Sequence, residues 1–322
     1  MYRSFIKGRK DIWQEVISSV QYKKEGISKI IKSILIVSIP ISLSALFSAT
    51  TKTIDAITIV RFLKNIIGER NATIQYGILS GKVDTLITLP YSFNIAFETA
   101  LIPAIATAIT KKQINTAKRK IEFSILVTIL IGLPCSICMS IFSKQILELL
   151  FPNAMDGDSM LRVSAWTIIF VVLTQTINGS LQGMGKVWTP VIAFGLGAVV
   201  KLIGNILLIP LTYINGAIIS SIISHFVSFI ICYIVLTRNI KLSLNIGKFL
   251  IKPTIASILM GMSSYIIYKK LTLIIQSNIS LIISLTLGVI MYIIMILVLK
   301  IVSKEEFLMI PYGQRLFKAL KR

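Results

Sequence analysis

Several ionisable side chains lie inside stretches of the sequence that are otherwise apolar. The longest such stretch, 77–110, contains three charged residues and two prolines (Lys82, Asp84, Glu98, Pro90, Pro103). On a helical period of 3.6 residues, four of its polar residues fall near one stripe (Asp84, Thr88, Tyr91, Glu98). Charged groups at membrane depth are costly, so they usually face a bundle interior or a watery cavity and mark a pathway. The stripe therefore predicts a polar cavity, and the prolines predict kinks in its helix.

Two further stretches carry charges at helical spacing. Lys52 and Asp55 lie one turn apart in 33–60, and such a pair can neutralise itself when it is buried. Lys201 and Asn205 lie one turn apart in 187–210. The depth of Asp55 and Lys201 in their stretches favours a cavity position.

The alternative for these charged residues is a place at a helix end, from which a side chain reaches the lipid headgroups. Lys82 and Asp84 lie near the outer end of a long stretch, so both interpretations remain open for them. Arg61 is predicted to reach the outer surface, with the mouth of the cavity as the alternative.

The composition is that of a polytopic helical membrane protein. Hydrophobic residues make up 55% of the 322 residues, charged residues 15%, and the mean hydropathy is +0.83. A soluble protein usually has about 25% charged residues. We expect an all-α transmembrane bundle with about eight spans, near 33–60, 77–110, 121–143, 163–181, 187–210, 215–236, 251–268 and 279–299.

The basic residues outnumber the acidic ones by 34 to 13, but they lie in short loops between apolar stretches, which argues against nucleic acid as a partner. The N-terminal segment and alternate loops hold 24 Lys and Arg residues, whereas the other loops hold 7. Positive charge is retained on the cytoplasmic side. The bias predicts that both termini are cytoplasmic, and we expect a multi-pass protein of the cell membrane, most simply the bacterial cytoplasmic membrane.

No motif for catalysis or for a metal is found. Cys135 and Cys138 form a C-x-x-C inside a span, without a second pair, and are interpreted as small packing residues. The lone D-x-D at 156–158 sits beside Asn153 and Gly157 and is interpreted as a turn. His225, the single histidine, has no acidic residue in its span and is interpreted as a core residue, with a proton-linked role as the alternative. We expect no enzyme, no metal site and no cofactor.

The tightest local motif is QTINGSLQGMGKVWTP at 175–190. It predicts a helical hairpin, with a short turn that we place on the cytoplasmic side and a proline early in the next span (Gln182, Gly183, Gly185, Lys186, Pro190). The pattern L-Q-G-x-G-K with a following Pro resembles the turn in the second lobe of the multidrug/oligosaccharidyl-lipid/polysaccharide flippase superfamily, which is MATE-like.

Other segments agree with this resemblance. TIDAITIVRFLKN, IQYGILSGKVDTLITLPYSFNIAFETALIPAIATA, SILVTILIGLPCSICM and ILELLFPNA are similar to stage V sporulation protein B and its relatives, the polysaccharide-type flippases. The resemblance implies that 33–238 is the second six-span lobe, that 239–322 forms two additional transmembrane helices and a basic cytoplasmic tail, and that 1–32 is a cytoplasmic amphipathic connector. A first lobe has no counterpart in this sequence.

The resemblance also implies a function. Such proteins move lipid-linked oligosaccharide or cell-wall and polysaccharide precursors by alternating access, which needs two lobes around one site. We therefore expect a flippase-like transporter, incomplete without the first lobe, with the bilayer, a lipid-linked sugar and a separate first-lobe chain as expected partners. The alternatives are a non-transporting scaffold or truncated remnant in sporulation or cell-wall synthesis, and a multidrug or cation antiporter.

The family's cationic cavity maps onto four basic residues that could attract a pyrophosphate (Lys52, Arg61, Lys82, Lys201). Asp55, Asp84 and Glu98 could balance that charge or bind a coupling cation, which the sequence does not identify. Asn205 completes the set of candidate pathway residues.

Overall fold

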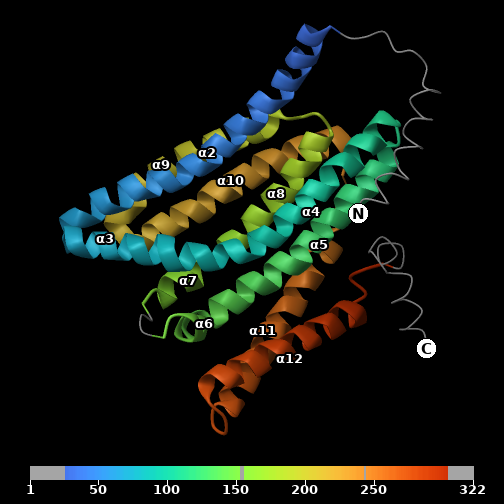
Figure 1. Ribbon diagram of the computed structural model, residues 1–322. Helices are drawn as coiled ribbons and strands as arrows, with labels where there is room; N and C mark the ends of the chain where they lie inside the picture. The colour runs from blue at the N-terminus through green and yellow to red at the C-terminus, as the bar shows by residue number, and fades with distance from the viewer. Residues whose placement is uncertain (1–25, 153–155, 243, 304–322) are drawn as a thin grey trace, which may run out of the picture. The chain divides into compact units, whose positions relative to one another are not determined.

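The computed structural model describes residues 26–152, 156–242 and 244–303. All regular secondary structure in these ranges is helical (Figure 1). The helices are α2 (Ile27–Ile67), α3 (Glu69–Ile78), the π-helical turn η1 (Leu79–Val83), α4 (Asp84–Thr110), α5 (Ile114–Ile141), α6 (Ser143–Leu150), α7 (Asp158–Ser164), α8 (Thr167–Gly183), α9 (Trp188–Thr212), α10 (Ile214–Ile240), η2 (Gly247–Ile251), α11 (Lys252–Leu271) and α12 (Ser277–Val298).

Eight helical segments of the described chain are long and apolar enough to cross a membrane, which confirms the expected all-α, multi-pass architecture. They are 27–67, 69–110, 114–141, 158–183, 188–212, 214–240, 247–271 and 277–298. The cytoplasmic position of the two termini stays a prediction. Most of the expected connector, 1–25, and most of the expected tail, 304–322, lie outside the described residues.

The chain divides into two compact units, 1–39 and 40–322, and helix α2 passes through both. The described part of the first unit is the beginning of α2, where the Gly26 carbonyl accepts hydrogen bonds from the backbone N–H groups of Lys29 and Ile30. All packing described below lies within 40–322.

The stretch expected to hold a polar stripe forms one continuous helical segment, Glu69–Thr110. Its regular α-helical pattern is interrupted at Leu79–Val83, where five residues form a π-helical turn. Pro90 and Pro103 both lie inside α4, downstream of that turn. The interruption of the α-helical hydrogen-bond pattern therefore precedes the prolines, which were the expected sites of distortion.

Small residues bring α9 and α10 into close contact. The Ser224 hydroxyl donates a hydrogen bond to the Gly197 carbonyl at 2.7 Å, and the Ser228 hydroxyl donates one to the Ala193 carbonyl at 3.0 Å. A side chain at Gly197 would collide with Ser228. Such small-residue contacts let helix backbones approach in a membrane, so the serines of the sixth span serve largely in packing, as their spacing indicated.

Helix α8 packs against α4 and α5, with α4 lying alongside α8 (Figure 1). Gly183 lies so close to α4 that a Cβ there would be 2.8 Å from the Ile102 carbonyl oxygen. Helices α11 and α12 form a hairpin, and α11 packs this hairpin against α5. The hydroxyl of Tyr292 on α12 donates a hydrogen bond to the carbonyl of Leu130 on α5 at 2.9 Å. Cys135 and Cys138 are free thiols on α5.

Candidate functional site

A polar cavity of about 220 Å³ lies among α2, α4, α8, α9 and α10. Part of its wall is apolar, and three of these apolar residues, Leu79, Ile87 and Ile218, also belong to a buried hydrophobic cluster that includes Ile59 and Leu63 of α2. The polar residues of its lining are Ser48, Thr51, Lys52, Asp55, Asp84, Thr88, Tyr91, Ser164, Thr167, Gln175, Lys201, Ser221 and His225. The cavity thus has a charged wall and adjoins a dry cluster.

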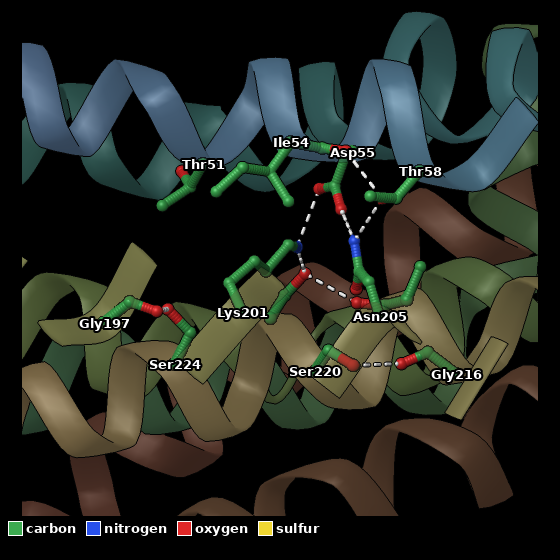
Figure 2. A network of polar contacts seen from close by, with 12 residues as sticks. Thr51, Ile54, Asp55, Thr58, Gly197, Lys201, Asn205, Gly216, Ser220 and Ser224 are labelled. Carbon is green, nitrogen blue, oxygen red and sulfur yellow. Dashed lines mark hydrogen bonds and ion pairs between the residues drawn. The ribbon is translucent and has the colours of Figure 1, made fainter. Parts of the chain in front are cut away.

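The centre of the charged wall is an ion pair between α2 and α9. The Lys201 Nζ lies 2.7 Å from the Asp55 Oδ2, and the side chains are 3% and 18% exposed (Figure 2). Lys201 also donates a hydrogen bond to the Ser221 hydroxyl of α10. Desolvated charges are tolerated when they are paired and hydrogen-bonded, and both conditions are met here.

Asn205 binds the same carboxylate from the other side. Its Nδ2 donates to Asp55 Oδ1 at 2.9 Å and contacts the Thr58 hydroxyl at 2.7 Å (Figure 2). Lys201 and Asn205 are four residues apart and so share one face of α9, while Asp55 and Thr58 share one face of α2. Both carboxylate oxygens of Asp55 therefore have partners on α9.

This cluster matters because α2 has few other close contacts. Within the described part of the chain, its Cα trace comes within 8 Å of another helix at only isolated points. Long side chains span the separation instead: the Asp55 cluster, the fully buried Ile59 and Leu63, and Phe47, whose ring would contact a Cβ at Gly195 at 3.7 Å. The polar cluster is thus one of the main attachments of α2 to the remaining helices.

Of the other charged candidates, some line the cavity and some do not. Lys52 and Asp84 line the cavity. Arg61 is exposed and is not part of the lining, and the Lys82 amine lies 5.7 Å from the centre of the Phe151 ring, also outside the lining. Two of the four basic candidates therefore reach the cavity, where two carboxylates balance them.

Glu98 lies farther along α4 than the cavity. Asn178 of α8 donates to its Oε1 at 3.2 Å, and Gln182 Nε2 donates to the Asn178 side-chain oxygen, Oδ1, at 3.1 Å. A Cβ at Gly179 would be 2.7 Å from the Glu98 Cγ. The predicted polar stripe is therefore divided: Asp84, Thr88 and Tyr91 face the cavity, and Glu98 lies in the contact between α4 and α8.

The expected pairing within α2 is replaced by one between helices. Lys52 and Asp55 are near neighbours on α2, but the short contact of the Asp55 carboxylate is with Lys201. The amine of Lys201 is almost fully buried and needs a counter-charge, whereas Lys52 is exposed on α2. Burial therefore decides which lysine takes the carboxylate.

One polar network was not anticipated from the sequence. Asn94 of α4 donates to the Val172 carbonyl at 2.9 Å and to the Gln175 side chain at 3.1 Å, and its side-chain oxygen accepts from Thr128 of α5 at 3.3 Å. The hydroxyls of Thr128 and Thr176 are 2.6 Å apart. Asn94 lies three residues after Tyr91 and four before Glu98, so the helical period that identified those two would have identified it.

His225 and Ser221 also belong to the cavity lining. They lie on α10 four residues apart, beside Ser224 and Ser228, whose hydroxyls donate hydrogen bonds to carbonyls of α9. The histidine was expected in a packed core, with a proton-linked role as the alternative, and the structure places it at the cavity.

The hairpin motif forms a tight turn between α8 and α9. Helix α8 ends at Gly183, Gly185 has a φ of +76°, and the Lys186 N–H donates to the Leu181 carbonyl at 2.8 Å. A positive φ strains other residues much more than glycine. Pro190 lies in the first turn of α9, where its missing N–H has no helical partner. Gln182 donates to the side chain of Asn178, which itself donates to Glu98. Hydrogen bonds therefore connect the hairpin motif to the Glu98 contact.

The D-x-D segment leads into a helix, with Asp158 as the first residue of α7. Gly157 has a φ of +108° and precedes α7, and Asp158 forms an ion pair with Arg162 at 3.9 Å. Within the described ranges, no group of three or more His, Cys, Asp or Glu side chains could hold a metal ion.

The sequence matches a family model. Residues 82–207 match the family described as MatE. This region runs from the beginning of the Asp84 helix to the Lys201 and Asn205 side of the cavity, so it contains most of the cavity wall.

Three curated proteins of Bacillus subtilis (strain 168) are similar to the chain. The uncharacterized membrane protein YabM is 30% identical over 186 residues, which are 58% of this chain and 35% of that protein. The lipid II flippase MurJ is 26% identical over 191 residues, 57% and 34% of the two chains. Stage V sporulation protein B is 22% identical over 247 residues, 76% and 47% of the two chains. The chain spans about a third to a half of the length of these relatives.

A solved structure shares the fold. The structure of the lipid II flippase MurJ in an inward closed conformation matches 88% of this chain and 57% of its own length, with a TM-score of 0.63 and 16% sequence identity. Together, the family model, the curated relatives and the shared fold support a member of the MATE-like flippase superfamily.

Proposed function

We propose that the chain forms one side of a membrane transport path for a lipid-linked cargo that carries phosphate and sugar. The observation that carries this proposal is the cavity itself, because charged residues from α2, α4 and α9 line it within membrane-spanning helices. Burying a charged side chain at membrane depth is energetically costly, and this cost by itself makes such residues candidates for a function. The relatives support the cargo class, since one of them is named a lipid II flippase.

Lys52 is the residue that we assign to the phosphate. Lys201 is bound to Asp55 and Ser221, so its amine is already neutralised. Lys52 lines the cavity, is exposed, and forms no ion pair within the described residues. An ammonium group binds phosphate as a compact point charge with several donors. Asp84 of α4, which also lines the cavity, limits the net positive charge and so favours release of the cargo over tight retention.

A complete path needs a second wall. Rocking of one lobe against another is the usual basis of alternating access, and the expected first lobe would supply that wall, from this polypeptide or from a separate chain. Helix α2 is suited to the moving boundary because few side chains attach it to the remaining helices.

The structure favours this proposal over the two alternatives. A cation antiporter needs a carboxylate that a cation can reach. Lys201 and Asn205 occupy both oxygens of Asp55, so among the lining residues only Asp84 could serve an antiporter. A scaffold needs no wet interior, whereas Asp55 and Lys201 lie in the lining of a cavity. A scaffold would be expected to keep such charges in the headgroup region.

The test is binding of a polyprenyl diphosphate sugar to the purified chain in lipid nanodiscs, measured by native mass spectrometry. We expect the diphosphate lipid to bind more tightly than the matching polyprenol. We expect Lys52→Gln to weaken binding of the diphosphate lipid roughly fivefold, because one exposed charge contact contributes about 1 kcal/mol. Lys64→Gln, an exposed lysine farther along α2, is the matched control.

Equal binding of the diphosphate lipid and the polyprenol would refute an anionic cargo. Equal binding by the Lys52 variant and the unchanged protein would refute the assignment of Lys52. For transport itself, the chain is combined in proteoliposomes with a first lobe from stage V sporulation protein B. Movement of the diphosphate lipid that requires both parts supports the proposal, and binding without any movement supports the scaffold.

A further inference from the structure

A second cavity, separate from the polar one, lies between α4 and α5. It has a volume of about 450 Å³ and shares no lining residue with the first. Its apolar walls are Phe97, Ala100, Leu101 and Ala104 of α4 and Phe123 of α5. Ala100 and Ala104 are one turn apart, so their small side chains leave a channel between the two phenylalanines. Ala100 is exposed, which opens the groove to the surroundings of the helix bundle.

One end of this groove is basic. Arg119 and Lys120 line it beside Thr116, and the Lys120 amine donates a hydrogen bond to the Ala104 carbonyl at 3.2 Å. That bond holds the lysine side chain across the groove from α5 to α4. A lysine ammonium has three donors, so two remain for a ligand.

The basic end continues into a polar pocket of about 440 Å³. Asn115, Thr116, Lys118, Arg119 and Glu122 line this pocket, and Thr116 and Arg119 are common to both cavities. Glu122 is the single acid of the pocket and lies 3.9 Å from the Lys118 amine. The apolar groove therefore leads directly into a pocket with a net positive charge.

The position along the helices fits a lipid headgroup. Helix α4 ends at Thr110 and α5 begins at Ile114, so the basic end lies at the end of both spans, where headgroups meet the protein. Lys111 and Lys112 in the connecting turn add to the positive charge. Basic pockets between membrane helices commonly bind anionic headgroups.

We propose that this groove and pocket bind an anionic phospholipid, with one acyl chain between Phe97 and Phe123 and the phosphate at Arg119 and Lys120. The two parts have the two properties of such a molecule in the right order along the membrane normal: an apolar channel at span depth and cationic donors at the span end. The bound lipid adds to the bond from Lys120 to Ala104 in joining α4 to α5.

The test uses the purified chain in detergent, with phosphatidylglycerol and phosphatidylcholine of the same acyl chains added as competitors. Native mass spectrometry measures the bound fraction of each lipid. We expect phosphatidylglycerol to be preferred and Arg119→Gln to lower its affinity about fivefold, because one basic residue near a charged membrane surface is worth about 1 kcal/mol. Arg238→Gln is the matched control, since Arg238 is an exposed arginine in the last turn of α10.

A second variant tests the channel. Ala100→Phe places a ring in the groove from an exposed position, and we expect it to reduce binding of both lipids while the chain remains folded by circular dichroism. Equal binding of the two lipids, equal losses in the Arg119 and Arg238 variants, or unchanged binding in the Ala100 variant would each overturn the proposal. None of these variants alters the polar cavity, so failure here leaves the cargo proposal unaffected.

Discussion

The amine of Lys201 on α9 lies 2.7 Å from the carboxylate of Asp55 on α2, and the lysine side chain is 3% exposed. Asn205 holds the second carboxylate oxygen at 2.9 Å. A buried charge that loses its partner is strongly destabilising, whereas removal of both partners is much less so. This relationship leads to the first prediction.

Lys201→Met leaves Asp55 without its counter-charge, and we expect a loss of about 3 kcal/mol in the free energy of unfolding. In the double variant Asp55→Asn, Lys201→Met, neither charge remains, so we expect most of that loss to be recovered. Denaturant unfolding in detergent micelles measures both values. Lys64→Met, at an exposed position of α2, serves as the control. Losses that simply add in the double variant would show that the two side chains are not coupled.

The second prediction concerns the contact between α4 and α8. A Cβ at Gly183 would be 2.8 Å from the Ile102 carbonyl oxygen and 3.0 Å from the Ile105 Cβ, and the backbone atom cannot move without shifting α4. We expect Gly183→Ala to cost about 1–3 kcal/mol through overpacking. Gly77→Ala is the control, because no atom lies within 4 Å of a Cβ there. Thermal unfolding in the same detergent compares them, and equal transition temperatures would argue against a tight contact.

The third prediction concerns the network that joins α4, α5 and α8. Asn94→Ala removes bonds to Val172, Gln175 and Thr128, and we expect a cost of about 1–2 kcal/mol, because interhelical hydrogen bonds in membranes are each modest. Ser92→Ala, two residues earlier, removes only a bond to the Thr88 carbonyl in its own helix. An equal effect of the two variants on the unfolding free energy would assign the network no role in stability.

The fourth prediction tests the orientation in the membrane. The charge bias places the turn with Lys186 in the cytoplasm and the segment with Arg70 outside. Both residues are exposed, so cysteines placed there are accessible to a thiol reagent that cannot cross the membrane. We expect Arg70→Cys to be labelled in intact cells and Lys186→Cys only after permeabilisation. The reverse pattern would invert the topology and place the basic groove on the outer side.

Local sequence properties predicted the spans well and the contacts only in part. Apolar runs of sufficient length identified the eight membrane-length helical segments of the described residues, because burial of backbone polar groups in lipid permits little besides helix. The same runs did not reveal the π-helical turn at Leu79–Val83, since hydropathy does not distinguish π-helical from α-helical hydrogen bonding. Gly183 and Gly185 were recognised as a turn because positive φ and close approach both select glycine.

The sequence by itself determined that this chain spans a membrane with helices, and that polar residues recur along individual faces. Only the tertiary structure decided which of those faces meet. Asp55 contacts Lys201 and not its own neighbour Lys52, and Glu98 leaves the stripe that Asp84 and Tyr91 follow into the cavity. The reason is physical: periodicity defines a direction around one helix axis, whereas a pairing also depends on the rotation, depth and spacing of a second helix.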